Sequence, residues 1–150
     1  MVQDKEIYLF QEEFPLIKQA TGWSINEFAD RVGVSRQTIN NYASGKYKIS
    51  KLHYKAMRYE FDDVIRNNEQ ESEMLKVVLD AFVDRPEEYT DKDRDEIRNK
   101  VNMMSPALSV QTVSKKDVSD TWKAITISVL SATAVAAIAS IVAGFWRKKI

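Results

Sequence analysis

A row of side-chain amides is the feature of this sequence best suited to recognition chemistry, and it lies within the run SRQTINNYASG. If this run is helical, steps of about 100° per residue place Gln37, Asn41 and Ser44 on the side opposite Ile39. Arg36 and Asn40 flank the row. Amide side chains can pair two-fold with adenine edges in the DNA major groove, and arginine with guanine edges. The row therefore indicates a base-reading surface.

Two short helical patterns separated by a glycine would position this row. Upstream, four apolar residues follow the i, i+3, i+4, i+7 spacing of one helix face: Ile25, Phe28, Ala29 and Val32. Ser24 precedes them and Glu27 follows three residues later, which is the pattern of a capping box. Gly33 comes where a chain leaving a helix often adopts the left-handed conformation, and Ser35 is placed to cap the second helix. The pattern predicts a helix, a tight turn and a second helix.

This segment resembles the Cro/repressor-type (XRE) helix-turn-helix of phage and bacterial regulators. The family's Ala, Gly and Ile/Val anchors match Ala29, Gly33 and Ile39 in register. The run VSRQTI is close to the family's usual recognition-helix start, and the run GKY to its usual exit. The resemblance covers roughly residues 12–60 and implies an all-helical DNA-binding domain.

The resemblance carries the family's base-reading positions to Arg36, Gln37 and Asn41. The family often has Gln opening the first helix of the motif, where it contacts phosphate, but Ile25 stands there in this chain. Phosphate contacts at that point would come from backbone amides or from Ser24. The candidate DNA-binding residues are Arg36, Gln37, Asn40, Asn41, Ser44, Lys46 and Lys48.

Charge is unevenly distributed along the 150 residues, although the formal net charge is zero. Residues 15–60 hold eight Lys and Arg against three Asp and Glu, whereas residues 61–105 hold seven against thirteen. A basic region centred on the motif suits a phosphate-binding surface. Lysines just after the motif, at positions 46, 48 and 51, fit phosphate contacts or an ordinary solvated loop.

No pattern in the sequence indicates an enzyme, a cofactor or a metal site. Cysteine is absent, and His53 is the only histidine, which favours a surface or interhelix role for it. The acids at 91, 93 and 95 do not form a calcium loop, because Glu96 replaces the required glycine. They are better explained as acids in the first turn of a helix, which a capping box at Thr90 and Asp93 would open.

The carboxyl-terminal part contains a stretch, residues 124–146, with 23 residues and no charge. Trp122 and Trp146 border it and basic residues lie at both ends, which is typical of a membrane-spanning helix. Small residues recur every four positions within it, which favours a helix-packing face: Ala124, Ser128, Ala132, Ala136, Ser140 and Gly144. The sequence therefore predicts a transmembrane helix.

The expected architecture is all-α, with four parts. These are a helix-turn-helix DNA-binding domain at 1–67, an acidic helical segment at 68–104, a linker at 105–122, and a transmembrane anchor with a basic tail at 123–150. The expected place is the cell membrane, single-pass, with the amino-terminal domain in the cytoplasm. Expected partners are double-stranded DNA, the lipid bilayer and further copies of the chain, as a homodimer or higher oligomer through the helical segment and membrane helix.

The expected function is a membrane-anchored, sequence-specific DNA-binding protein, a transcriptional regulator of phage, plasmid or bacterial origin. Two alternatives stay open at this point. One is a RodZ-like membrane adaptor, which would use the helix-turn-helix domain to bind protein. The other is a holin-like phage effector, in which the membrane segment would assemble a lesion or complex. DNA-reading chemistry on the outward face favours the regulator over the adaptor.

Overall fold

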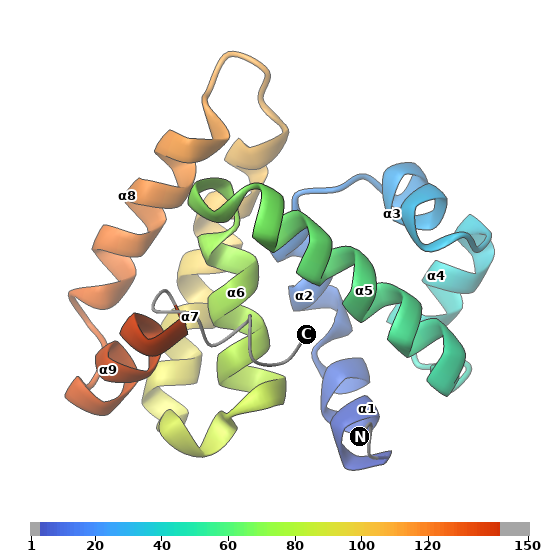
Figure 1. The fold of residues 1–150 in the computed structure, drawn as a ribbon, viewed down its shortest axis with the longest axis horizontal. Coiled ribbons are helices and arrows are strands. Elements are labelled where there is room, and N and C mark those ends of the chain that lie inside the picture. The colour runs from blue at the N-terminus through green and yellow to red at the C-terminus, as the bar shows by residue number, and fades with distance from the viewer. Residues whose placement is uncertain (1–3, 142–150) are drawn as a thin grey trace.

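The computed structural model describes residues 4–141, and every regular element in that range is a helix, which confirms the all-α prediction for it. The first five are α1 (Asp4–Glu12), α2 (Phe14–Thr21), α3 (Ile25–Val32), α4 (Arg36–Ala43) and α5 (Lys51–Asn67). The next four α-helices are α6 (Glu73–Leu79), α7 (Asp91–Met104), α8 (Lys115–Ile127) and α9 (Ala132–Ser140). Short 3₁₀ and π turns lie between them: η1 (Glu69–Glu71), η2 (Asp80–Asp84), η3 (Pro86–Glu88) and η4 (Ser105–Ser109). Figure 1 shows α3 and α4 on one side of the molecule, α8 and α9 on the other, and α6 between them.

The helix-turn-helix begins and turns where the sequence predicts. Ser24 and Ser35 cap α3 and α4, each through a side-chain oxygen that accepts from the backbone N–H three residues on. Gly33 ends α3 with a φ of 85°, in the left-handed region that glycine adopts without steric cost. The capping box at Ser24 is only half formed, because the Glu27 carboxylate pairs instead with Arg31 at 3.2 Å. The local chemistry of the chain thus fixes the motif.

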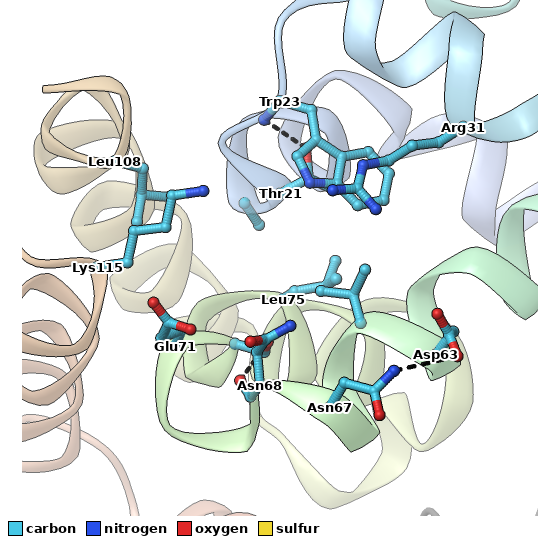
Figure 2. A pocket seen from close by; sticks show the side chains of 13 residues that line it. Thr21, Trp23, Arg31, Asp63, Asn67, Asn68, Glu71, Leu75, Leu108 and Lys115 are labelled. Carbon is cyan, nitrogen blue, oxygen red and sulfur yellow. Dashed lines mark hydrogen bonds between the residues drawn. The ribbon is translucent and has the colours of Figure 1, made fainter. Parts of the chain in front are cut away.

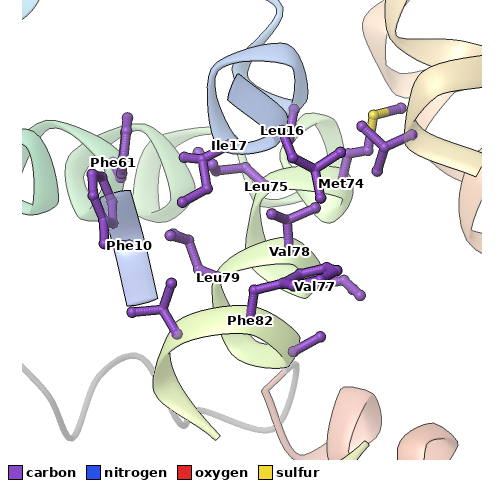
Figure 3. Packing of buried hydrophobic residues seen from close by; sticks show 14 of the residues in the cluster. Phe10, Leu16, Ile17, Phe61, Met74, Leu75, Val77, Val78, Leu79 and Phe82 are labelled. Atoms are coloured by element: carbon purple, nitrogen blue, oxygen red, sulfur yellow. The ribbon is translucent and has the colours of Figure 1, made fainter. Parts of the chain in front are cut away.

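Helix α6 lies at the centre of the fold, and its whole circumference is buried. Every residue from 72 to 83 is buried, as expected for a helix enclosed on all sides. It packs against α2, α5, α7 and α8, and Figure 3 shows its apolar side chains beside those of the first helices. The buried residues labelled there are Phe10, Leu16, Ile17, Phe61, Met74, Leu75, Val77, Val78, Leu79 and Phe82. The apolar surface of α6 is therefore used inside the chain.

Charged side chains that enter this core are paired. Asp84, the last residue of η2, accepts two parallel hydrogen bonds from Arg58 of α5, at 2.8 and 2.9 Å. Within α6, Lys76 bonds Glu73 at 3.3 Å. Such pairing is needed because an uncompensated buried charge is strongly destabilising. The Arg58–Asp84 pair therefore joins the helix-turn-helix domain directly to the helices that follow residue 67.

The prediction of one helix across residues 124–146 is wrong. Helix α8 ends at Ile127, and Ser131 starts α9 by accepting a hydrogen bond from the Ala134 N–H at 3.2 Å. Within residues 4–141, no helix combines the length and apolar character that crossing a bilayer requires. The predicted single-pass location in the cell membrane is accordingly wrong. The end of the predicted span, with Gly144 and Trp146, and the basic tail lie outside the described residues.

Asp93 is the reason that the chain turns at Ser131. Its carboxylate accepts from the Ser131 N–H at 2.9 Å and from the Ser131 hydroxyl at 2.7 Å, and it also closes the capping box of α7 with Thr90. Burial disfavours the charged form of Asp93, but the hydrogen bonds from Thr90 and Ser131 outweigh it, so its pKa is lowered. The break also prevents the small-residue stripe from forming one continuous face.

The other end of α9 is held by Arg85. Its guanidinium donates to the Ala137 carbonyl at 2.9 Å and to the Ser140 hydroxyl at 3.0 Å, while it pairs with buried Asp80 at 2.7 Å. Buried Ala134, Ala137 and Ile138 then pack α9 into the common core. Residues 105–122, predicted as a linker, contain η4 and the first part of α8. Leu108 of η4 approaches Gly22 so closely that a Cβ there would lie 2.8 Å from the Leu108 Cβ.

Candidate nucleic-acid interface

Helix α4 presents the predicted polar row to solvent. Ile39 and Tyr42 are buried beneath it, which fixes the rotation of the helix and therefore the direction of its outer side chains. In the row, Gln37 and Ser44 are exposed and Asn41 is half-buried, and the flanking Arg36 and Asn40 are exposed as well. The geometry thus brings the predicted base-reading residues onto one exposed surface, and their role in DNA binding stays a prediction.

Hydrogen bonds along α4 orient the two central amides. Gln37 Nε2 donates to Asn41 Oδ1 at 3.1 Å, which links side chains one helical turn apart. The Ser44 hydroxyl donates to the Asn41 carbonyl at 3.2 Å, at the end of the helix. After the Gln37–Asn41 bond, each amide still has donor and acceptor capacity. A paired amide row of this kind suits recognition of donor and acceptor groups on base edges.

Gln11 on α1 holds the turn that follows the recognition helix. Its Nε2 donates to the carbonyls of Tyr42 and Tyr47, at 3.2 and 2.6 Å, and its Oε1 accepts from the Ile49 N–H at 2.9 Å. One side chain therefore bonds three backbone groups, one in the last turn of α4 and two in the loop between α4 and α5. Sequence reasoning missed this residue, because a single Gln in an amphipathic helix gives no local signal of a partner more than thirty positions away.

A second contact joins the end of α4 to α5. The Tyr42 hydroxyl lies 2.6 Å from His53 Nδ1, and the two rings meet edge to face with centroids 5.8 Å apart. Ser50 caps α5 by accepting from the His53 N–H at 3.1 Å, so His53 is fixed through its backbone as well. Of the two roles predicted for His53, on the surface or between helices, the structure shows the second. Gln11 and His53 together set the position of the helix that carries the amide row.

Positive charge gathers near the carboxyl-terminal end of α4, where the amide row ends. From position 36 to position 59 the sequence contains six Lys and Arg and no Asp or Glu. Four of these cations are exposed lysines in or just beyond the loop: Lys46, Lys48, Lys51 and Lys55. The Lys46 ammonium lies 5.6 Å from the centroid of the Tyr47 ring, a distance typical of a cation–π contact. Lysines beside an amide-bearing helix are suited to holding a phosphate backbone.

Arg31 has a different environment from these lysines. Its guanidinium lies 4.5 Å from the centroid of the Trp23 ring and pairs with Glu27. Trp23 in turn contacts Phe28 with ring centroids 5.4 Å apart. Arg31 therefore belongs to the junction between α3 and the rest of the protein.

Comparison with protein families agrees with this geometry. Residues 17–57 match a family described as helix-turn-helix, a match that starts in α2 and ends in α5. This supports the resemblance of the segment to the Cro/repressor type, a class of DNA-binding regulators. No curated protein and no solved structure matches the chain.

Proposed function

We propose that this protein is a sequence-specific binder of double-stranded DNA that acts as a transcriptional regulator. The observation that carries the proposal is the exposed amide row of α4, held from behind by Gln11 and His53. The match of residues 17–57 to the helix-turn-helix family supports the same function.

In this proposal the outer face of α4 contacts the bases. Gln37 and Asn41 present amides suited to adenine, and Arg36, at the first position of the helix, suits guanine. Each well-formed bidentate contact discriminates against the wrong base by about 1–3 kcal/mol. Asn40 lies on the flank, where it reaches either the neighbouring base pair or the sugar-phosphate backbone.

Phosphate contacts come from Ser44, Lys46 and Lys48, which follow the amide row and are exposed. Such contacts add affinity for any sequence and set the register of the helix on the duplex. Because a short recognition helix reads only part of a helical turn, two copies on half-sites about one turn apart give the specificity that regulation needs.

The test is selection of DNA sequences from a random pool by the full chain, followed by titration of the enriched duplex. We expect an enriched motif, affinity that falls with added salt, and a Kd about tenfold or more higher after Gln37→Ala or Asn41→Ala. Asn99→Ala, at an exposed position on α7, is the matched control and should leave the Kd unchanged. Absence of any enriched motif, or equal affinity of Gln37→Ala and the parent, would overturn the proposal.

A further inference from the structure

The outward face of α5 carries two large apolar side chains that are mostly exposed. Leu52 is 74 % exposed and Tyr59 is 65 % exposed. They are seven residues apart, which is close to two helical turns, so both lie on one line along the helix. Figure 1 shows α5 crossing in front of α2 on the near side of the molecule. A line of apolar side chains on an exposed helix is suited to packing against another helix.

Opposite charges stand at equal distances from Tyr59 on the same face. Lys55 precedes Tyr59 by four residues, and Asp63 follows it by four. Since four residues turn a helix by about 40° beyond one full turn, the two charges lie close to the line of Tyr59, one on either side. Lys55 is exposed, and the Asp63 carboxylate is oriented by Asn67, whose Nδ2 donates to Oδ1 at 3.3 Å (Figure 2). The face is therefore self-complementary: turned end to end, its lysine meets its aspartate.

We propose that this face pairs two copies of the chain, with their α5 helices antiparallel and the two-fold axis at Tyr59. In that arrangement the two Tyr59 rings contact each other, and Lys55 of each copy lies opposite Asp63 of the partner subunit. Leu52 lies opposite the aliphatic part of Arg66 of the partner subunit, which follows the axis by seven residues. A parallel pair would set each charge against its own copy, so electrostatic repulsion disfavours it.

The pairing is weak in the free protein, because one face of a single helix is a small interface. Interfaces at the low end of the size range are typical of transient complexes, and ion pairs exposed to solvent add little to affinity. We therefore expect the free chain to associate with a Kd of roughly 100 µM.

The same pairing suits two copies on one duplex, a step that rests on the proposed function, whereas the pairing itself does not. Figure 1 shows α3 and α4 on one side of α5. A two-fold axis that runs between antiparallel helices at right angles to them keeps both α4 helices on the same side of the pair, as one duplex requires. Each α5 begins eight residues before Tyr59, so the two first residues lie about 24 Å apart along the helices. This distance is of the same order as the spacing of half-sites, about 34 Å.

Introduced cysteines test the position of the axis in the full chain, which has no cysteine of its own. Helices that pack about 8–10 Å apart bring facing Cα atoms at the axis to about 3.5–5.5 Å, because each Cα lies about 2.3 Å from its own helix axis. A disulfide spans about 4.4–6.8 Å between Cα atoms. We therefore expect Tyr59→Cys to form a covalent dimer under mild oxidation.

Leu52→Cys is the matched control for this cross-link. Its two thiols would lie about 21 Å apart along the helices, seven residues on either side of the axis, which is too far for a disulfide. It should stay monomeric although Leu52 is the more exposed of the two side chains. Absence of a covalent dimer with Tyr59→Cys overturns the proposal, and so does a Leu52→Cys dimer that forms as fast.

Charge reversal tests the pairing through self-association, measured by sedimentation equilibrium without DNA. Lys55→Glu should weaken association about tenfold or more, since two like charges then face each other twice in the dimer. Combining Lys55→Glu with Asp63→Lys exchanges the charges and should restore the parent's Kd. Lys92→Glu, at an exposed position on α7, changes the net charge equally and should associate as the parent does. A parent that stays monomeric at about 1 mM, or a double variant no better than Lys55→Glu, refutes the pairing.

The link to DNA is tested separately on the selected duplex. Tyr59→Asp places two carboxylates at the axis and should lower the cooperativity of binding to a duplex with two half-sites, while its affinity for a single half-site equals that of the parent. Unchanged cooperativity refutes the link to DNA alone. Loss of DNA binding by the parent refutes the proposed function and leaves the pairing supported by its own two tests.

Discussion

Removal of the Gln11 side chain tests whether the loop after α4 must be held for DNA to be read. In Gln11→Ala, three hydrogen bonds are lost: the Tyr47 carbonyl and the Ile49 N–H lose the Gln11 side chain, and the Tyr42 carbonyl keeps only the Gly45 N–H at 3.2 Å. Each intramolecular hydrogen bond contributes about 1 kcal/mol net. Since Tyr47 is exposed and its carbonyl can turn to water, we expect a loss of about 2 kcal/mol in the free energy of unfolding.

The same variant should weaken DNA binding without changing charge. Lys46 and Lys48 lie in the loop that Gln11 holds, so their position relative to Gln37 and Asn41 becomes less defined. We expect the Kd to rise about tenfold, which corresponds to about 1.4 kcal/mol, with an unaltered slope of log K against log salt because no phosphate-binding charge is removed. Urea unfolding measures the first effect, and fluorescence anisotropy of the selected duplex at several salt concentrations measures the second.

The control for this experiment is Gln19→Ala, which makes the same replacement at an exposed helical position. Gln19→Ala should change the free energy of unfolding and the free energy of DNA binding by no more than about 0.5 kcal/mol each. The reasoning is refuted if Gln11→Ala matches Gln19→Ala in both stability and affinity. Lower stability with unchanged affinity would show that the loop needs no support for DNA binding.

Three further variants test separate parts of the structure. Gly22→Ala should cost about 1–3 kcal/mol more than Gly33→Ala in urea unfolding, because both adopt positive φ but only Gly22 lies against Leu108. Lys46→Gln should reduce the salt slope of DNA binding by about one while leaving sequence preference intact, which a salt titration on specific and random duplexes would measure. The lowered pKa of Asp93 implies stability that is present above the carboxyl's unfolded pKa of about 3.9 and lost as pH falls through the lower folded value. The stability difference between the parent and Asp93→Asn should therefore shrink below about pH 4, and a constant difference from pH 6 to pH 2 would contradict this.

Sequence reasoning was successful where the information is local. Ser24, Ser35 and Gly33 mark the ends of helices by their own backbone preferences, and Thr90 forms the predicted capping box with Asp93. The direction of the α4 side chains followed from one periodic face, because Ile39 must be buried. Features of this kind need only a few neighbouring residues, so the helix-turn-helix and the location of its polar row were predictable.

The missed features depend on partners that are distant in sequence. The uncharged stretch after Lys123 met the length and composition criteria for a bilayer span, but those criteria do not register a serine that caps a new helix. Ser131 does so because Asp93, 38 positions earlier, accepts its N–H and hydroxyl. Likewise, Gln11 was not identified, since its three partners lie at the end of α4 and in the following loop, which only the fold brings next to α1.

The central place of α6 has a consequence for engineering. Because this helix fills the space between α2, α5, α7 and α8, the amino-terminal motif has no hydrophobic centre that is complete without it. A gene fragment that stops at residue 67 would leave Leu16 and Ile17 of α2 uncovered on the side that α6 covers. The motif is therefore not separable from the rest of the chain, and a chimaera built to transfer its DNA specificity should include the helices that follow it.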